Sequence, residues 1–405
     1  MLRELGYKYL LIDSEIVSQI FEEGYLSELQ TFSKFGRIFI LGAFKPKIKI
    51  PFLFSYVKLS PEIKESSKDV ISRIRENKNN FLELNKILNL PKNKIRSKVL
   101  YLKKTQGSVL TDIAKLYNLD FETCRKKRDC DLRLATYGME NCPHQCIYCF
   151  ANYNWTQPTT LLFDFDKKLQ EDLNKPKLRK IIKQGWPIHV GSIMDFGSKL
   201  SIFFKQIHKA LGVLKRKNVF IGTKSPLIAK DDVIKAIKKH GRAEIMFTYT
   251  GLRELEPNLP YNSRNFPSKS IKKLTSNKIR VILLYKPIIP GMNDKEKEIW
   301  EVFRKAKEAG VIEISTGFLK MNYRFQEAIK VNSPQYYKYF KKVLSEQVGK
   351  TDFLPSYQYR VAMAKKLRKI CDKLNLRISF CQPFIGDLKS KLANSLCPCR
   401  KERWK

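Results

Sequence analysis

The sequence predicts an α/β protein organised around an open or partial (β/α) barrel, and two patterns support this prediction. Beyond Cys149, short runs that favour β-strand alternate with helical stretches. Strands that alternate with helices in this way form parallel βαβ units. The chain contains neither Gly-x-Gly-x-x-Gly nor Gly-x-x-x-x-Gly-Lys-[Ser/Thr], the phosphate loops of dinucleotide-binding and P-loop folds. A barrel of this kind binds its ligands at the carboxyl ends of the strands.

The chain of 405 residues is long enough for two or three domains. Residues 1–129 are predicted to form a basic N-terminal accessory region that contains short strands. Within it, residues 61–90 are polar and indicate an exposed helix or a linker. Apolar residues at helical spacing, such as Val109 and Ile113, predict a packing helix over residues 108–124.

Residues 130–320 are predicted to be the barrel core, and residues 321–405 a C-terminal extension of helices and strands with a group of cysteines. The predicted barrel strands are, in order, 187–193, 218–223, 243–249, 278–289, 311–315 and 376–380. The clearest helix is 294–309, which has an apolar stripe on one face and Gly310 at its end. Either Asn293 or Asp294 is expected to cap it.

The chain carries 78 Lys+Arg and 39 Asp+Glu, a formal net charge of +39. Such an excess attracts phosphate backbones and anionic surfaces, so DNA or RNA is the expected partner. AT-rich coding bias is the alternative source of the lysines. Two basic runs stand out, at 92–104 and 205–239, and aromatic residues mix with bases at 336–342, as in surfaces that stack unpaired bases.

Residues 1–17 include Arg3, Glu4, Asp13 and Glu15, so they lack the charge order and apolar run of a signal peptide. No apolar run approaches the roughly 18 residues of a transmembrane helix. We therefore expect a cytoplasmic protein without membrane contact. In a reducing compartment, nine cysteines, an odd number, indicate metal binding or catalysis and not disulfides.

The most informative segment holds Cys142, Cys146 and Cys149 within eight residues. Three thiolates leave one iron of a [4Fe–4S] cube without a protein ligand, and such an iron can bind a small molecule. The alternative is a zinc ion held by the same cysteines and a fourth ligand such as His144. The step of two residues from Cys142 makes His144 an awkward ligand of the same ion.

The pattern Cys142-x3-Cys146-x-Tyr148-Cys149 resembles the signature of the radical S-adenosylmethionine (SAM) superfamily. The resemblance implies that the three cysteines hold a [4Fe–4S] cluster whose open iron chelates SAM. Reduction by a donor such as a ferredoxin or flavodoxin would cleave SAM and form a 5′-deoxyadenosyl radical. Tyr148 would lie near the adenine.

Further stretches resemble the spore photoproduct lyase-like branch, often called DNA repair photolyase-like. They extend over about residues 137–316 and include the segments 142–151, 191–195, 220–228, 255–264 and 286–294. Spore photoproduct lyase, for which this branch is named, uses an additional cysteine downstream of the cluster as a hydrogen-atom donor, and branch members without it are largely of unassigned chemistry. This chain has no cysteine between Cys149 and Cys371, which puts the same reaction in doubt.

Three residues are candidates for binding SAM. Lys224, at a strand end, would bind the SAM carboxylate. Asp195 would bind the amino group or the ribose hydroxyls, or would instead cap the following helix. Thr248 would donate a hydrogen bond to the carboxylate. His189 lies on an apolar strand and is expected to be a core residue.

The remaining cysteines suggest a second site. Cys130, Cys381, Cys397 and Cys399 are candidates for a second Fe–S cluster or a zinc ion. The alternatives are a redox pair, a hydrogen-atom donor or unpaired buried thiols. Cys371 lies on the apolar side of a helix and is expected in the core.

The leading hypothesis is a radical SAM enzyme, lyase-like, that repairs or modifies a nucleic acid. The second is a radical SAM enzyme acting on a small molecule or a protein. The third is a metal-stabilised nucleic-acid-binding protein without catalysis. The sequence identifies no catalytic residue for the substrate step.

Overall fold

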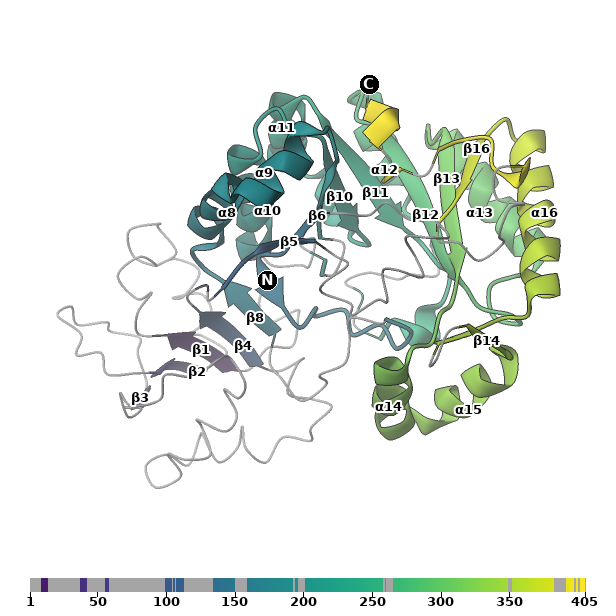
Figure 1. The fold of residues 1–405 in the computed structure, drawn as a ribbon, viewed down its shortest axis with the longest axis horizontal. Coiled ribbons are helices and arrows are strands. Elements are labelled where there is room, and N and C mark those ends of the chain that lie inside the picture. The colour runs from purple at the N-terminus through teal and green to yellow at the C-terminus, as the bar shows by residue number, and fades with distance from the viewer. Residues whose placement is uncertain are drawn as a thin grey trace.

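The computed structural model (Figure 1) describes residues 9–13, 37–41, 55–57, 99–103, 105, 107–112, 134–149, 159–191, 194–195, 201–257, 259, 265–348, 352–381, 391–396, 398–399 and 401–404. The predicted exposed segment 61–90 lies outside these residues. The described strands form a sheet of eight, a sheet of six and a two-stranded hairpin. The large sheet positions the candidate site.

The large sheet has the order β16-β13-β12-β11-β10-β9-β6-β5. Neighbouring strands from β6 to β16 pair parallel, and β5 pairs antiparallel with β6. The strand bounds are β5 Leu110–Asp112, β6 Leu134–Thr136, β9 Ile188–Val190, β10 Val219–Thr223, β11 Ala243–Thr248, β12 Val281–Ile288, β13 Glu313–Phe318 and β16 Arg377–Phe380. Each of the six predicted barrel strands overlaps one of these elements, so that prediction is confirmed; β13 extends three residues beyond the predicted 311–315.

Helices connect the parallel strands, as the βαβ pattern requires. Figure 1 shows α8–α11 grouped beside β6 and β10, and α13 and α16 beside β13 and β16. Their bounds are α8 Phe165–Asn174, α9 Pro176–Lys183, α10 Ser201–Val213, α11 Asp231–His240, α12 Ser268–Ser276, α13 Glu296–Glu308, α14 Tyr323–Asn332, α15 Pro334–Val343 and α16 Tyr357–Lys373. Among the described residues, no helix is long and apolar enough to cross a bilayer.

Alternate residues of the parallel strands face opposite sides of the sheet. Ile221, Phe247 and Leu283 belong to the core shared with the helices. Their neighbours Phe220, Met246 and Ile282 form a second cluster with Trp404. We call the side that carries this second cluster the concave face.

The helix predicted at 294–309 is confirmed as α13, but its predicted cap is wrong. Lys295 occupies the N-cap position and makes no side-chain cap. Asn293 is buried and serves a turn instead, accepting from Ile289 N at 2.8 Å and donating to Thr250 O at 3.0 Å. Asp294 accepts a hydrogen bond from Tyr359 at 2.7 Å. Both candidate caps are therefore engaged in tertiary contacts.

The second sheet has the order β3-β2-β1-β4-β8-β7. Its bounds are β1 Tyr9–Asp13, β2 Arg37–Leu41, β3 Ser55–Val57, β4 Val99–Lys103, β7 Met139–Glu140 and β8 Thr159–Leu162. The strands pair parallel except for β7 with β8. This sheet therefore joins strands from both sides of residue 130, with β8 beside β4.

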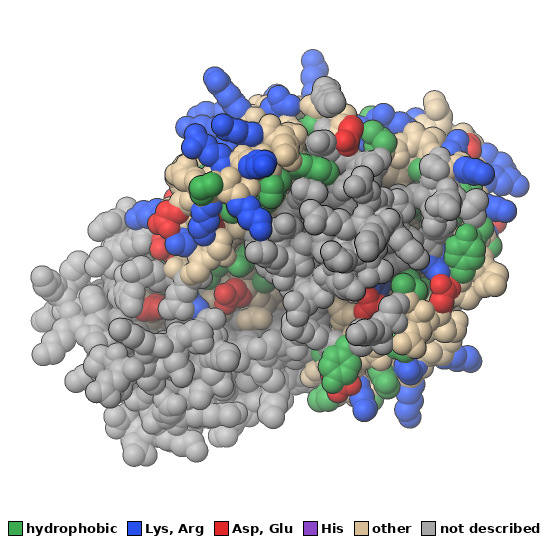
Figure 2. All heavy atoms as spheres, in the orientation of Figure 1, with side chains coloured by type: hydrophobic (Ala, Val, Ile, Leu, Met, Phe, Trp, Pro, Cys, Tyr) green, Lys and Arg blue, Asp and Glu red, His purple; other side chains and the backbone are tan. Residues whose placement is uncertain are grey.

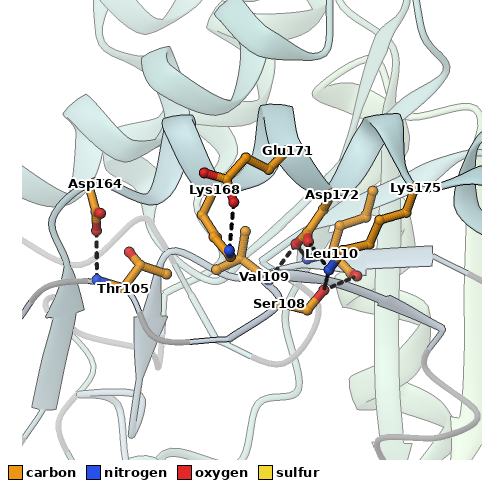
Figure 3. A network of polar contacts seen from close by, with 9 residues as sticks. All are labelled: Thr105, Ser108, Val109, Leu110, Asp164, Lys168, Glu171, Asp172 and Lys175. Atoms are coloured by element: carbon orange, nitrogen blue, oxygen red, sulfur yellow. Dashed lines mark hydrogen bonds and ion pairs between the residues drawn. The ribbon is translucent and has the colours of Figure 1, made fainter.

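The structure describes residues 108–112 of the helix predicted at 108–124, and there the prediction is wrong, because β5 occupies residues 110–112. The cause is a tertiary contact with α8 (Figure 3). The fully buried carboxylate of Asp172 accepts from the backbone N–H groups of Val109 and Leu110, at 2.6 and 2.9 Å. Lys175 Nζ lies 2.5 Å from the other oxygen of Asp172. Asp164 Oδ1 accepts from Thr105 N at 2.6 Å.

A short 3-10 turn, Lys401–Trp404, covers the amino end of the concave face. Arg403, whose side chain is 5% exposed, donates to Glu313 at 2.7 Å and lies 3.5 Å from Glu244. Trp404 packs edge-on against Phe220 with 4.9 Å between ring centroids. Glu313 begins β13 and Glu244 lies near the start of β11, so this turn closes the end of the barrel opposite the carboxyl ends.

Candidate active site at the carboxyl end of the barrel

The cysteine loop, residues 141–149, follows β7 and is anchored to the segment after β11. Ile147 N donates to Leu255 O at 2.8 Å, and Cys149 N donates to Cys146 O at 3.0 Å. Asn141 and Gln145 adopt left-handed backbone angles, with φ of 56° and 50°. Cys146, Ile147 and Tyr148 pack in one cluster with Leu252 and Leu255. These contacts hold the loop beside the carboxyl ends of β10 and β11.

The three thiols of this loop lie within electrostatic range of one another. Burial raises the pKa of Cys146 well above its usual value, and the nearby Glu256, Cys149 and Cys142 add to that rise. Lys224 acts in the opposite direction. Burial, followed by Asp195, raises the pKa of Cys142 to about 12. Buried thiols that oppose each other's ionisation suit a cationic group that binds them as thiolates.

The described residues contain no set of three His, Cys, Asp or Glu side chains close enough to hold one metal ion. In an iron–sulfur cube each cysteine binds a separate iron atom, so its thiolates need not converge on one point. Three thiols on one loop are the donor set of a cube that has one iron without a protein ligand.

Glu256 is the centre of the polar contacts beside the loop, and the sequence analysis did not select it. Its Oε1 accepts from Lys224 Nζ at 2.7 Å, from Thr250 Oγ1 at 2.9 Å and from the Tyr148 hydroxyl. Its side chain is 3% exposed. The one signal in the sequence was its position in the 255–264 stretch. We call Glu256, Lys224, Tyr148 and Thr250 the Glu256 hub.

The predicted SAM ligands Lys224 and Tyr148 are both in this hub. Lys224 follows β10 and its ammonium lies 5.4 Å from the centre of the Tyr148 ring. Burial alone would lower the pKa of Lys224, but Glu256 and Cys146 outweigh it and raise that pKa. Burial, Cys146 and Glu256 raise the pKa of Tyr148 well above its usual value. Lys224 is therefore a cation and Tyr148 a neutral phenol.

Asp195, the third predicted ligand, is buried against the start of the cysteine loop. It accepts from Thr223 Oγ1 at 2.7 Å and from Lys224 N at 2.5 Å, and it lies 3.0 Å from His144 Nε2. Burial would raise the pKa of Asp195, but His144 and these hydrogen bonds lower it. The following helix, α10, begins at Ser201, so Asp195 does not cap it.

Thr248, the fourth predicted ligand, ends β11 and is half-buried on the same strand face as Met246. The hydroxyl that reaches Glu256 belongs to Thr250, two residues further along. His189 is 4% exposed, as expected for a core residue. Its ring packs against that of Phe220, with 5.2 Å between the ring centroids. Burial and then the charge of Lys286 lower its pKa to about 3.

Two members of the predicted second metal site, Cys381 and Cys399, are among the described residues. Cys381 follows the carboxyl end of β16. Cys399 is buried next to the 3-10 turn whose Arg403 pairs with Glu313, at the amino end of β13. Cys130 and Cys397 lie outside the described residues. Cys371 is fully buried in α16, as predicted.

The amino end of the barrel carries a row of exposed bases. They lie in the segments 183–187, 214–218, 238–242 and 276–280, which precede β9, β10, β11 and β12 and contain no Asp or Glu. Asn218 ties three of these segments together, donating to Gly185 O at 2.9 Å and accepting from Arg242 at 2.8 Å. We call Lys183, Lys215, Arg216, Lys238, Lys239, Arg242 and Lys278 the basic edge.

Figure 2 shows Lys and Arg side chains gathered over the part of the molecule that carries α8, α9 and α11 in Figure 1. Lysines in the last turns of α9 and α11 are favoured there by the helix dipole. Lys215, Arg216 and Lys278 lie in the loops beyond the helices, where the dipole alone does not account for them. The basic edge therefore lies at the amino ends of the strands, the opposite end from the cysteine loop.

The chain has the fold of spore photoproduct lyase. A structure of a variant of that enzyme with dinucleoside spore photoproduct matches with a TM-score of 0.62 and 11% identity, over 92% of this chain and 98% of that chain. A second variant, with bound AdoMet and dinucleoside spore photoproduct, matches with a TM-score of 0.61 and 10% identity, over 93% and 99% of the two chains. No protein-family model and no curated protein sequence matches the chain.

Proposed function

We propose that the protein is a radical SAM enzyme in which Cys142, Cys146 and Cys149 hold a [4Fe–4S] cluster. One observation carries the proposal: the three-cysteine loop is anchored at the carboxyl ends of β10 and β11, in a fold shared with an enzyme solved with AdoMet. Ligands of (β/α) folds bind at this end. The cluster with SAM would supply reductive cleavage of SAM to a 5′-deoxyadenosyl radical.

The residues of the chain would bind and orient SAM beside the loop. Lys224 has three N–H donors, of which one is directed to Glu256, and the ammonium is suited to the SAM carboxylate. Asp195 and Glu256 are buried carboxylates that match the SAM amino group. Tyr148, buried and fixed by Glu256, offers its ring to the adenine. Thr248, half-buried at the end of β11, is suited to a carboxylate oxygen.

We further propose that the substrate is part of a nucleic acid. The basic edge, the net charge of +39 and the likeness to a lyase solved with a dinucleoside lesion support this class. Phosphate contacts position a nucleic acid on a protein, whereas specific contacts select the base. The basic edge would bind the backbone away from the reacting nucleotide. An external one-electron donor such as a ferredoxin or flavodoxin would complete the reaction.

The test of the chemistry is 5′-deoxyadenosine formation. Protein reconstituted anaerobically with iron and sulfide is given SAM and dithionite, and Cys146→Ala is compared with Cys371→Ala, whose thiol lies in α16 away from the loop. We expect product from wild type and Cys371→Ala and none from Cys146→Ala. Equal product from both variants would contradict the assignment. Added DNA or RNA that raises the rate would support a nucleic-acid substrate, and a rate that ignores both would favour the small-molecule alternative.

A further inference from the structure

A cysteine thiol outside the cysteine loop accepts a hydrogen bond from a lysine on the concave face. Lys286 Nζ, on β12, donates to Cys381 Sγ, just after β16, at 3.0 Å. The backbone N–H of Cys381 donates to Thr316 O at 2.6 Å, which continues the ladder between β13 and β16. Both side chains are half-buried. The sulfur is therefore fixed in place and still reachable.

The contact passes over a glycine on the strand between them. In the sheet order, β13 separates β12 from β16, so Lys286 must cross β13 to reach Cys381. Gly317 is the residue that it crosses. A Cβ at that position would lie 3.5 and 3.6 Å from Lys286 Cδ and Cε, and 3.0 Å from Cys381 O. A Cβ there would be in ordinary van der Waals contact with the lysine stem, and its tight contact would be with the carbonyl oxygen of Cys381.

Two buried hydroxyls face the same side, next to this pair. Ser315 on β13 and Ser379 on β16 are register partners, and they are 1% and 0% exposed. Within the described part of the chain, neither hydroxyl has a hydrogen-bond partner. Ser379 precedes Cys381 by two residues and so shares its strand face. Buried hydroxyls are normally satisfied, so this wall is suited to a ligand that carries a polar oxygen.

We propose that Lys286 and Cys381 form an ammonium–thiolate pair, and that this wall is a nucleophilic site for an electrophile whose carbon–carbon double bond is conjugated to a carbonyl group. The thiolate is the reactive form of cysteine, and an adjacent lysine favours it. The same ammonium opposes binding of a metal cation at this sulfur. The inference does not depend on radical chemistry at the cysteine loop.

The reaction balances without an external oxidant or reductant. The sulfur electron pair forms a carbon–sulfur bond. The π pair of the carbon–carbon double bond shifts to the bond with the carbonyl carbon, and the π pair of the carbonyl moves onto its oxygen. The resulting enolate takes one proton, from the Lys286 ammonium or from water. The hydroxyls of Ser315 and Ser379 are placed on the face where they would donate to the carbonyl oxygen as its charge develops.

The probe is N-ethylmaleimide, which carries this conjugated group. Full-length protein is labelled briefly at neutral pH, and labelling of each cysteine is measured by peptide mass spectrometry. We expect Cys381 to react about tenfold faster in wild type than in Lys286→Gln, since one pKa unit changes the thiolate fraction about tenfold. Lys297→Gln, which removes an exposed lysine of α13, is the matched control and should behave as wild type. Buried Cys371, whose pKa is raised to about 12 mainly by burial, should react slowest.

Gly317→Ala tests the same pair without removing either partner, and it should slow the labelling of Cys381 because the added Cβ crowds the Cys381 carbonyl oxygen and shifts the thiol from the lysine. Lys286→Arg should retain most of the reactivity because it keeps the charge. Equal rates for Cys381 in wild type and Lys286→Gln would overturn the proposal. It would also be overturned if a metal chelator were needed before Cys381 reacted, because the thiol would then be a metal ligand.

Discussion

The two ends of the barrel treat charge in opposite ways. At the carboxyl end, Lys224 and Glu256 are 15% and 3% exposed and are paired with each other. At the amino end, the bases of the basic edge are exposed, and the buried pair of Arg403 and Glu313 closes the concave face. Buried, paired charges fix the positions of reactive groups, whereas exposed bases attract a polyanion over a distance. Under the proposed function, the chemistry at the cysteine loop and the attraction of a polyanion would be separated along the strand axis.

The largest expected effect is at the carboxyl end, in Glu256→Ala. Removing one partner of a buried ion pair leaves the other charge without compensation, which costs about 3–5 kcal/mol. Lys224 would be that charge, and Tyr148 and Thr250 would lose their acceptor at the same time. We expect the free energy of unfolding in urea to fall by about that amount.

Glu254→Ala is the matched control for this experiment, because Glu254 is an exposed carboxylate two residues earlier. It should change the free energy of unfolding by less than about 0.5 kcal/mol. Glu256→Gln keeps an acceptor oxygen, so its free energy of unfolding should lie between those of Glu256→Ala and Glu254→Ala. If Glu256→Ala unfolded at the same urea concentration as Glu254→Ala, the hub would have no role in stability.

At the amino end, Arg403→Met should lower the free energy of unfolding by about 2 kcal/mol, which is less than Glu256→Ala does. Hydrogen bonds to charged groups contribute about 1.5–3 kcal/mol. Glu313 would keep Arg280 as a partner, at 3.3 Å. Glu256, in contrast, accepts hydrogen bonds from three side chains. We therefore expect Arg403→Met to lower the free energy of unfolding less than Glu256→Ala does. The measurement is the urea midpoint beside that of Arg304→Met, an exposed ion-pair residue of α13 that should contribute about 0–1 kcal/mol. A loss at Arg403 no larger than that at Arg304 would show that the 3-10 turn does not stabilise the barrel.

The connection between the two sheets gives a pH-dependent prediction. Burial would raise the pKa of Asp172, but the hydrogen bonds from Lys175, Leu110 and Val109 lower it below 3.8. The folded state therefore releases this proton more readily than the unfolded chain does. The stabilisation from the Asp172 carboxylate is complete above about pH 3.8, the usual pKa of the group, and is lost as the pH falls below that value. Asp172→Asn should lower the free energy of unfolding by about 1–2 kcal/mol at neutral pH.

Urea unfolding of wild type and Asp172→Asn between neutral pH and about pH 3 tests this linkage. The difference between the two proteins should shrink as the pH falls. Asp232→Asn, which removes an exposed carboxylate of α11, should track wild type at each pH. A difference that stayed constant at low pH would mean that the charge of Asp172 is not what holds the 107–112 segment.

The barrel strands could be predicted from the sequence because strands buried on both faces form short apolar runs. The region around 108–124 could not, because the backbone of Val109 and Leu110 is bound by Asp172, 63 and 62 residues away. Helical spacing describes only local preference, and this distant carboxylate outweighs it. Asn293 failed as a cap for the same reason, since its amide is used by Thr250 and Ile289.

The candidate site shows a similar division. The cysteine loop was visible because its three cysteines are close in sequence, and Lys224 and Asp195 were visible at strand ends. Glu256 was missed because its donors, at positions 148, 224 and 250, meet only in the fold. A single acidic residue in the sequence carries no sign of three distant partners. The charge balance indicated a polyanion partner, and the basic run 205–239 contains four of the seven bases of the basic edge. The fold adds Lys183, Arg242 and Lys278, which the sequence did not group with them.

The smallest effect on stability is expected at the basic edge. Replacing Lys183, Lys215 and Lys239 with Gln removes three exposed charges and should change the free energy of unfolding by less than about 0.5 kcal/mol per site. Binding should respond differently, because each lost phosphate contact lowers the slope of log K against log salt by about 1. A matched triple variant at Lys297, Lys365 and Lys369, exposed lysines of α13 and α16, removes the same charge elsewhere. Fluorescence anisotropy with labelled DNA and RNA across a salt series distinguishes the two triples. Equal slopes would mean that net charge alone attracts the nucleic acid, and a reduced slope only for the basic-edge triple would place the backbone at the amino end of the barrel.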